Sequence, residues 1–485
     1  METGLEAALG RWTEGRGPLH RKLSDAVRAA VETGRVRPGS RLPSERELAV
    51  RLAVSRSTVV TAYDTLRAEG LLESRQGSGT RVRSPVGAGA DGEVHLEDIP
   101  VNPVYRTLLE DDGAVISLAA AILPAHPLVG EAIAAAAGDA GRLLALGGYY
   151  PAGLPALREA LAEHHRRHGT PTTADQILVT TGAQQGVNLA TQLFVRGGDA
   201  VVVESPSFAG TLDTFRARRA RFVPVAVDDG GIDPRAVADA CAAESPAAIY
   251  VTPSFQSPTG ALLPEHRRRT LAELAADRRI PLIEDNALEG APLDDVRLPP
   301  IAAYAPADAP VVTAGSFSKV AWGGLRVGWL RGPATLVSRL AELKVTADLG
   351  SPLFDQAVAA RLVPRLEDIR ADRAATLRSH LALVDRLLSD QLPDWHWRRP
   401  TGGPALWVEL PGGTADTFAQ VALRFGVEVV PGALMSPTGG HERHLRLPIT
   451  AEPAVLEETI RRLAGAWRAY APDDAHRPMR RPVVV

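Results

Sequence analysis

Lys319 is the residue of this chain that most clearly offers covalent chemistry. An uncharged lysine amine attacks aldehydes and forms a Schiff base with them. The chain has only three lysines, Lys22, Lys319 and Lys344, and Lys319 alone follows a strand-like run. It is flanked by Ser316, in the run GSFSK, and by Arg326, seven residues after the lysine. The motif therefore predicts Schiff-base chemistry on an aldehyde.

Three more motifs follow strand-like runs elsewhere in the chain. The turn TGAQQG (181–186) opens a helix, whose free backbone N–H groups and dipole favour a phosphate. Phe208 offers a ring that can stack on a flat cofactor. Asp285 ends a buried strand, where an unpaired charge is costly, so we expect a cationic partner for Asp285 or for its neighbour Glu284. Together with the Lys319 motif, these features predict a pocket for pyridoxal 5′-phosphate (PLP), with Asp285 at the protonated pyridine nitrogen.

The elements that must position these motifs alternate after Ile116. Strand-like apolar runs are separated by helical stretches, which is typical of an α/β domain with a mainly parallel sheet covered by helices. Ligands of such sheets bind at the carboxyl ends of the strands, and each motif above lies just after a strand. The runs are Ile177–Thr180, Ala200–Val203, Ala248–Val251, Pro281–Glu284 and Val311–Thr313.

These segments resemble the fold-type I aminotransferases, which depend on PLP, from about Ile116 to Ala471. The resemblance implies that Lys319 forms the internal aldimine and that Asp285 binds the pyridine nitrogen. It also implies that Arg446, in the run HLRL, grips the α-carboxylate of a substrate or effector. The phosphate ligands implied are Ser316, Arg326, Gly182, Ala183 and Gln184, and the stacking ring is Phe208.

Two departures from the family pattern affect the cofactor's 3′-oxygen. The run SFQSPTG (254–260) resembles the family's SFQNPTG, with Ser257 in place of the asparagine that binds this oxygen. Ala287 and Leu288 stand where the family has a tyrosine, two or three places after Asp285. Such hydrogen bonds help to set the protonation and position of the ring. We therefore expect Ser257 near a bound cofactor, but little or no transamination.

The N-terminal segment reads as a winged helix-turn-helix. Apolar residues recur at helical spacing over residues 19–32, and Ser44 and Glu47 form a capping-box pattern for a second, short helix. A third helix begins after Ser55 and ends at Gly70. Residues 71–73 and 80–83 then read as two strands around the turn RQGSG, which forms the wing.

DNA contacts are expected at one side of this module. The third helix of such a motif enters the major groove, and Arg56 is the best candidate for reading base edges. Basic residues cluster at this side, which disfavours the alternative that the three helices only mediate protein contact. The predicted contacts are Ser55, Arg56, Ser57 and Thr58 at the helix start, Arg41, Ser44 and Arg46 at phosphates, and Gly77 in the wing.

The motifs RLPSERELA (41–49), VSRSTVV (54–60) and AYDTLRAEGL (62–71) resemble the winged helix-turn-helix of GntR-type repressors, from about Pro18 to Arg83. Some members have an arginine where this chain has Val60. A GntR-type module followed by a linker and an aminotransferase-like domain resembles the MocR-type regulators. The resemblance implies a winged helix-turn-helix over 1–84, a linker over 85–115 and a PLP- and effector-binding domain over 116–485.

The function expected is a DNA-binding transcription regulator. It would bind a double-stranded operator and sense PLP itself, or an amine or amino acid that forms an external aldimine with PLP. One rival is a working aminotransferase with an accessory DNA-binding module, against which Ser257, Ala287 and Leu288 count. A second rival is a regulator that no longer binds PLP, against which the retained Lys319 and Asp285 count. Whether the chain is an enzyme is left open, with little or no turnover expected.

A homodimer is expected, and the linker allows its modules to be exchanged. About thirty residues at about 3.3 Å each reach on the order of 100 Å, enough for one module to lie over the other subunit. In the family, a tyrosine reaches the phosphate bound by a neighbouring subunit. Tyr149 and Tyr150 lie near the position of that tyrosine in the sequence. Alignment to Gly153 nevertheless places Gly148 at that position.

Composition agrees with a multidomain globular protein of 485 residues with a net charge of −3. Up to Ser84 there are 15 basic and 10 acidic residues, against 39 and 47 in the rest, so the N-terminal part alone favours a polyanion. One cysteine, the lack of a signal-peptide pattern and the lack of a long apolar run predict a cytoplasmic protein without membrane contact. No metal is expected: His164, His165 and His168 read as a solvated basic helix end without a third ligand.

Overall fold

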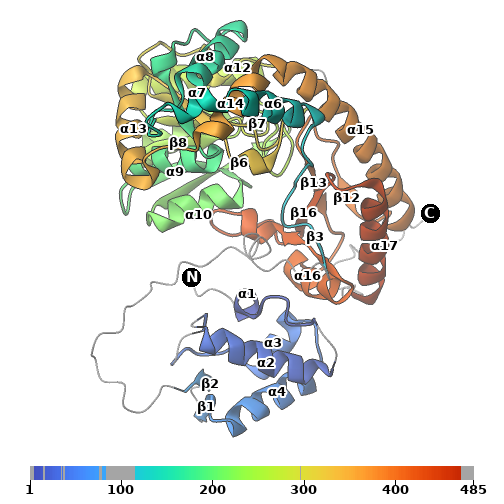
Figure 1. Cartoon of the computed structure of the whole chain (residues 1–485). Coiled ribbons are helices and arrows are strands. Elements are labelled where there is room, and N and C mark those ends of the chain that lie inside the picture. Colours follow the sequence, from blue (N-terminus) through green and yellow to red (C-terminus); the bar gives the residue numbers. More distant parts are fainter. Residues whose placement is uncertain are drawn as a thin grey trace, which may run out of the picture.

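The computed structural model describes residues 5–14, 17–33, 35–36, 39–75, 79–83, 115–294 and 296–470. Gly77 and nearly all of the linker predicted over 85–115 lie outside these residues. The N-terminal module, the sheet-containing domain and a C-terminal subdomain follow one another along the chain (Figure 1). None of the helices in the described parts of the chain is both long and apolar enough to cross a bilayer.

The N-terminal module is a winged helix-turn-helix. Val59, Ala62, Tyr63 and Leu66, at helical spacing on α4, are fully buried among the other helices. The helix ends as predicted, because Gly70 has φ 74° and closes the last turn. The elements are α1 (Leu5–Leu9), α2 (Leu19–Glu32), α3 (Glu45–Arg51), α4 (Arg56–Ala68) and the antiparallel pair β1 (Leu72–Arg75) and β2 (Gly79–Val82).

Both predicted serine caps of the module are present. The Oγ atom of Ser44 accepts a hydrogen bond from the backbone N–H of Glu47 at 3.2 Å, and that of Ser55 accepts one from Thr58 at 3.2 Å. The capping box predicted for α3 forms on one side only. The side chain of Glu47 pairs with Arg51, one turn along, instead of reaching back to the cap.

An eight-stranded sheet forms the centre of the large domain and is mainly parallel, as predicted. Two strands are exceptions: β11 runs antiparallel to both neighbours, and the edge strand β7 runs antiparallel to β6. The strand order is β4-β11-β10-β9-β8-β5-β6-β7. The strands are β4 (Ile177–Thr180), β5 (Ala200–Ser205), β6 (Arg221–Asp228), β7 (Gly231–Ile232), β8 (Ala248–Val251), β9 (Leu282–Asp285), β10 (Val311–Ser316) and β11 (Gly328–Arg331).

Helices cover both faces of this sheet. Successive residues of a strand point to opposite faces, and here the residues on each face are apolar. On β5, Val201 and Val203 pack under α9, α10 and α13, whereas Val202 packs on the other face with α11 and α12. A third cluster packs α6, α8 and α14 against β4 and β11. The helices are α6 (Pro127–Gly138), α7 (Ala140–Leu144), α8 (Pro155–Arg167), α9 (Ala183–Phe194), α10 (Ala209–Ala217), α11 (Pro234–Glu244), α12 (Glu265–Arg278), α13 (Ala334–Asp348) and α14 (Leu353–Leu362).

The C-terminal subdomain has its own core around Trp395 and Phe418. Its antiparallel sheet has the order β12-β13-β16-β15, and a separate parallel pair joins β14 to β3, the first strand after the linker. Figure 1 shows α16 facing the N-terminal module and α15 running back to the large domain. The elements are β3 (Ile116–Ser117), α15 (Leu366–Gln391), β12 (His396–Trp397), β13 (Ala405–Glu409), α16 (Ala415–Arg424), β14 (Val427–Glu428), β15 (Val430–Pro431), β16 (His444–Pro448) and α17 (Pro453–Tyr470).

Candidate functional site

A cavity of about 370 Å³ lies where the carboxyl ends of the parallel strands meet the C-terminal subdomain. Loops after β4, β5, β8, β9 and β10 line it, and β16 closes it from the subdomain side. The cavity brings together all ten residues that the sequence proposed for the cofactor and the effector. They are Lys319, Asp285, Ser316, Arg326, Gly182, Ala183, Gln184, Phe208, Ser257 and Arg446.

Lys319 is held inside this cavity by a backbone oxygen. Its Nζ donates a hydrogen bond to the carbonyl of Ala121 at 2.5 Å. Burial, and then the positive charge of Arg446, lower the pKa of Lys319 to about 8. A substantial share of the amine is therefore uncharged slightly above neutral pH, as nucleophilic attack requires.

Asp285 is buried, and its carboxylate receives only neutral donors. The Tyr250 hydroxyl donates to Oδ2 at 2.9 Å and the backbone N–H of Ala287 to Oδ1 at 2.9 Å. Burial raises the pKa of Asp285, and these two hydrogen bonds oppose the rise. Among the residues that the structure describes, no cation pairs with Asp285. A protonated ring nitrogen would supply the missing positive charge, so this carboxylate fits PLP.

Glu284 lies in a different environment, in which groups of the protein donate hydrogen bonds to its carboxylate. Its oxygens accept hydrogen bonds from Thr313 Oγ1 at 2.8 Å, Asn286 Nδ2 at 3.0 Å and the N–H of Ile301 at 2.7 Å. Burial raises the pKa of Glu284, and the charge of Arg268 lowers it. Of the two carboxylates that the sequence left open, only Asp285 is left in need of a cationic ligand.

Another group of residues in the cavity lining offers the features of a phosphate site. Gly182 is the N-cap of α9 and has φ 137°, which favours glycine. A Cβ there would lie 3.3 Å from Nη2 of Arg326, so the missing side chain leaves room beside the guanidinium. Ser316 Oγ donates to Ser318 Oγ at 3.0 Å. The side chain of Gln184 instead donates to the carbonyl of Gly210 and to Thr214, which leaves its backbone N–H as the group for a phosphate.

The cavity lining includes the three residues expected at the cofactor's 3′-oxygen, Ser257, Ala287 and Leu288. Ser257 offers one hydroxyl, and Ala287 and Leu288 contribute no hydrogen-bonding side chain. Sequence reasoning missed Tyr250, the donor to Asp285. Tyr250 reaches Asp285 because it belongs to the neighbouring strand, where the pairing of β8 with β9 sets Tyr250 against Ile283, and this register could not be read from the sequence.

Arg446 lies on β16 and reaches the cavity from the C-terminal subdomain. It is buried, and its Nη2 donates to the carbonyl of Ala119 at 2.6 Å. Tyr149 is 74% exposed, and neither it nor Tyr150 lines the cavity in the single chain. The aromatic wall includes Phe208 and Phe255.

Comparison with known families agrees with this geometry. The family model "Aminotransferase class I and II" matches residues 120–466, and "Bacterial regulatory proteins, gntR family" matches residues 19–82. The chain belongs to the class I and II aminotransferase family. This family is PLP-dependent. With a GntR domain that binds DNA in front, the chain is a transcription regulator of the MocR type.

Relatives of both kinds support this assignment. The chain is 29% identical over 495 residues to the HTH-type transcriptional regulator TauR of Rhodobacter capsulatus, covering 94% of this chain and 97% of TauR. It is 28% identical over 401 residues to the probable rhizopine catabolism regulatory protein MocR of Rhizobium meliloti, covering 77% and 79%. A solved family structure is LysN, the α-aminoadipate aminotransferase of Thermus thermophilus, complexed with N-(5′-phosphopyridoxyl)-L-leucine. It superimposes with a TM-score of 0.68 at 29% identity, covering 76% of this chain and 95% of LysN.

The predicted DNA contacts of the GntR-type module that the structure describes are exposed, apart from Thr58, which is half-buried. Arg41, Arg46 and Arg56 are exposed, and Arg56 is the first residue of α4. The hydroxyl of Ser55 lies 2.8 Å from those of Ser57 and Thr58, so these side chains also build the start of the helix. Their roles at DNA stay predictions.

The prediction that the three histidines are exposed to solvent is wrong for two of them. His164 and His165 are 7% and 8% exposed, because the end of α8 is tucked against β11, where Trp329 Nε1 donates to His165 Nε2 at 3.1 Å. Burial lowers the pKa of both histidines to about 3. The helix end is therefore packed with neutral rings.

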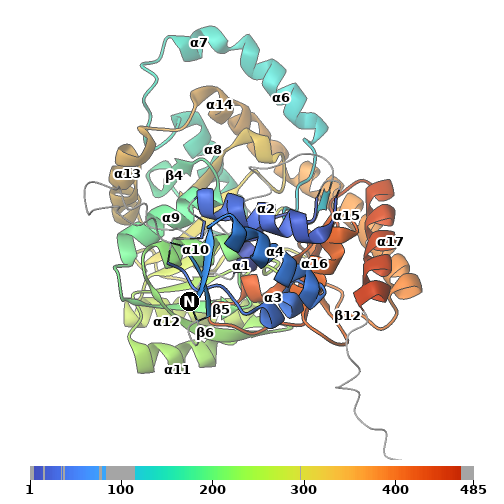
Figure 2. The same ribbon diagram turned by 90° about the horizontal axis from the view of Figure 1, so that it is seen from below.

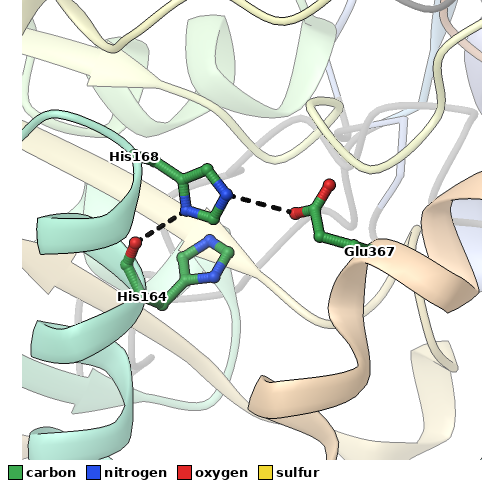
Figure 3. A group of neighbouring side chains, drawn as sticks. All are labelled: His164, His168 and Glu367. Carbon is green, nitrogen blue, oxygen red and sulfur yellow. Dashed lines mark hydrogen bonds and ion pairs between the residues drawn. The ribbon is translucent and has the colours of Figure 1, made fainter.

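The structure also brings a carboxylate to these histidines that the sequence did not reveal. Figure 3 shows His168 between the carbonyl of His164, at 2.7 Å, and Glu367, at 3.4 Å. The possible ligand atoms of the three residues lie within 4.8 Å of one another. Arg297 already supplies a positive charge there, since it pairs with Glu367 and Glu289 and lies 3.3 Å from His164 Nε2. The cluster is an ion-pair network around Arg297.

Proposed function

We propose that this regulator senses PLP, or an amine or amino acid that reacts with bound PLP, in the cavity around Lys319. One observation supports this proposal: the same chain carries a GntR-type module and a cavity whose residues fit the cofactor. Lys319 has a lowered pKa, and Asp285 is buried without a cationic partner. Burying an amine and a carboxylate that do not pair with each other is costly, and bound PLP would offset this cost with an aldehyde at the amine and a protonated ring nitrogen at the carboxylate.

Each residue is assigned one part of the work. When bound, PLP supplies an aldehyde that reacts with primary amines. Lys319 provides the amine of the protein, and Asp285 holds the proton on the ring nitrogen. Phe208 stacks on the ring, and Arg446 grips the carboxylate of an effector. The phosphate is bound by Ser316, Arg326 and the start of α9 at Gly182, Ala183 and Gln184.

The second candidate function, a working aminotransferase, is favoured by the likeness to LysN. The cavity wall counts against it, because Ser257, Ala287 and Leu288 replace the groups expected to fix the ring through its 3′-oxygen. Catalysis depends on orientation far more than binding does. We therefore propose binding of the ligand with little turnover.

The regulator is proposed to act as a homodimer on a double-stranded operator, with the divisions 1–84, 85–115 and 116–485. A ligand switches such a protein only if it binds the DNA-competent and DNA-incompetent states unequally. Neither the operator nor the sign of control enters this proposal.

Operator affinity in the presence and absence of ligand tests the proposal. DNA fragments are selected from a random library with the full-length protein, and their Kd is measured without PLP, with PLP, and with PLP plus a panel of amines and amino acids. We expect at least one ligand state to change the Kd by about fivefold or more, the lower end of typical coupling. Absence of DNA binding at low salt, or a Kd that no ligand state changes, would reject the regulator-sensor function.

A further inference from the structure

Residues 116–121, here named the strap, accept hydrogen bonds from two residues that line the cavity. The carbonyl of Ala121 accepts the hydrogen bond from Lys319, and the carbonyl of Ala119 accepts the one from Arg446, at 2.6 Å. Two of the three cations proposed to bind ligand, Lys319 and Arg446, are therefore also bound to the strap. The backbone N–H of Ala119 donates in turn to the Oγ of Ser117 at 3.2 Å.

The other end of the strap is bound to β14. Ser117 Oγ donates to Oε2 of Glu428 at 2.6 Å, and the strands β3 and β14 pair in parallel through Ile116 and Ser117. The same Oε2 accepts a hydrogen bond from Arg11 of the N-terminal module at 3.3 Å. The side chains of Arg11 and Glu428 are only 10% and 20% exposed, so the pair is partly screened from water.

Two further bonds attach the module to the same subdomain. Trp12 Nε1 donates to Gln420 Oε1 at 3.2 Å, and Arg424 Nη1 donates to the carbonyl of Ala53 at 2.8 Å. Ala53 lies in the turn between α3 and α4, the two helices of the helix-turn-helix. Figure 2, seen from below, shows the blue module lying across α16. The contact thus reaches the elements that position the recognition helix.

We propose that the strap couples occupation of the cavity to docking of the DNA-binding module, through Arg446, Ser117, Glu428 and Arg11. This inference rests on the proposed function, because it takes the ligand to be one with a carboxylate at Arg446. A carboxylate is a stronger acceptor for a guanidinium than a backbone carbonyl. Its arrival draws Arg446 from Ala119, frees the strap and weakens the hold of Glu428 on the module.

Spin labels test the coupling in the full chain. Glu32→Cys on α2 and Glu457→Cys on α17 place labels on exposed positions of the module and the subdomain, and Cys241 is buried. Labelled chains are diluted with excess unlabelled chains, and the distance distribution is measured by double electron–electron resonance. The probe is N-(5′-phosphopyridoxyl)-L-leucine, which carries a phosphate, a pyridine ring and a carboxylate in one stable molecule.

We expect a narrow distribution without the probe and a loss of at least half of this population with it. Ser117→Ala and Glu428→Gln should show the broadened distribution without any probe, as should Arg446→Met. Glu409→Gln, which removes a carboxylate paired with Arg443 on the same subdomain, is the matched control and should stay narrow.

The outcomes separate the coupling from the proposed function. Calorimetry that shows no binding of the probe would reject the ligand site, while the three variants would still test the strap. The coupling is overturned if bound probe leaves the distribution narrow, if Ser117→Ala and Glu428→Gln both behave like the control, or if the ligand-free protein is already broad.

Discussion

The amine of Lys319 is the group whose protonation decides whether the cavity can react. Its pKa of about 8 arises mainly from burial, since water that would solvate the charged form is excluded. Only the uncharged form attacks an aldehyde. The rate of reaction with PLP should therefore rise about tenfold per pH unit below pH 8 and level off above it.

This first prediction is checked by the visible absorption band that forms when PLP is added. Lys319→Ala should give no band, because no other lysine lines the cavity among the residues that the structure describes. Lys22→Ala is the control, since Lys22 lies in the N-terminal module and donates to Thr13 there. A wild-type protein that stays colourless in excess PLP would contradict the assignment of Lys319.

At this scale the sequence predicted residues that line the cavity, and missed residues that hold them in place. Lys319, Asp285 and Arg446 stand in motifs of distinctive composition, so their types and order were enough. Tyr250 and Ala121 act through a strand register and a backbone carbonyl, which no residue type announces. The buried state of His164 was missed for the same reason, because it depends on what packs against the helix end.

The end of β5 carries a carboxylate whose ionisation should govern stability. Glu204 is fully buried, and burial raises its pKa from 4.5 to about 7. The folded state then binds a proton that the unfolded state releases between these two values. This contribution to stability is fully present below about pH 4.5 and is lost as the pH rises through 7.

The second prediction follows from this difference of about 2.5 pKa units, which corresponds to on the order of 3 kcal/mol. The free energy of unfolding of Glu204→Gln relative to wild type should rise by that order between pH 4.5 and pH 8. Urea unfolding at a series of pH values measures it. A difference that does not change with pH would mean that folding does not raise the pKa of Glu204.

The recognition helix α4 gives the third prediction. Arg56 is its first residue and is exposed, so Arg56→Ala should relax base specificity at one position of the operator, at a cost of about 1–3 kcal/mol. Arg46→Ala should weaken binding to all sequences and reduce the salt slope by about one. Arg28→Ala is the control, because Asp25 and Glu69 already neutralise Arg28. Equal loss for specific and random DNA in Arg56→Ala would contradict base reading.

The elements themselves were predicted where a single pattern determines them. The 3.6-residue periodicity predicted α2 over residues 19–32 and the apolar face of α4, and both are as expected. The antiparallel strand β11 was missed, because the direction of a strand depends on its partners and not on its own composition. The same holds for the pair of β3 with β14, which joins residues more than 300 positions apart in the sequence.

The whole molecule joins a basic DNA-binding module to an acidic ligand-binding remainder. Up to Ser84 the chain carries a net charge of +5 and beyond it −8, from the counts of basic and acidic residues. The module docks on the C-terminal subdomain, which also carries Arg446. One subdomain therefore contacts both the proposed effector and the DNA-binding part, an arrangement that a sensor needs and that a metabolic enzyme does not.

Slow turnover is the fourth prediction, and it follows from that arrangement. A sensor must keep its ligand long enough to shift a population of states, whereas a transaminase releases a product. With Ser257, Ala287 and Leu288 at the side expected for the 3′-oxygen, a bound ring is held by its phosphate, by Asp285 and by Phe208, and its tilt is less fixed. Amino acids should therefore change the visible spectrum of the PLP-loaded protein, while keto product forms far more slowly than about 1 per second.

The cofactor band and the keto product are followed together over a panel of amino acids. The double variant Ser257→Asn with Leu288→Tyr restores both hydrogen-bonding types and should raise the rate, whereas Ser207→Ala, a buried hydroxyl outside the cavity lining, should not. Wild-type turnover at about 1 per second or faster would instead favour the aminotransferase.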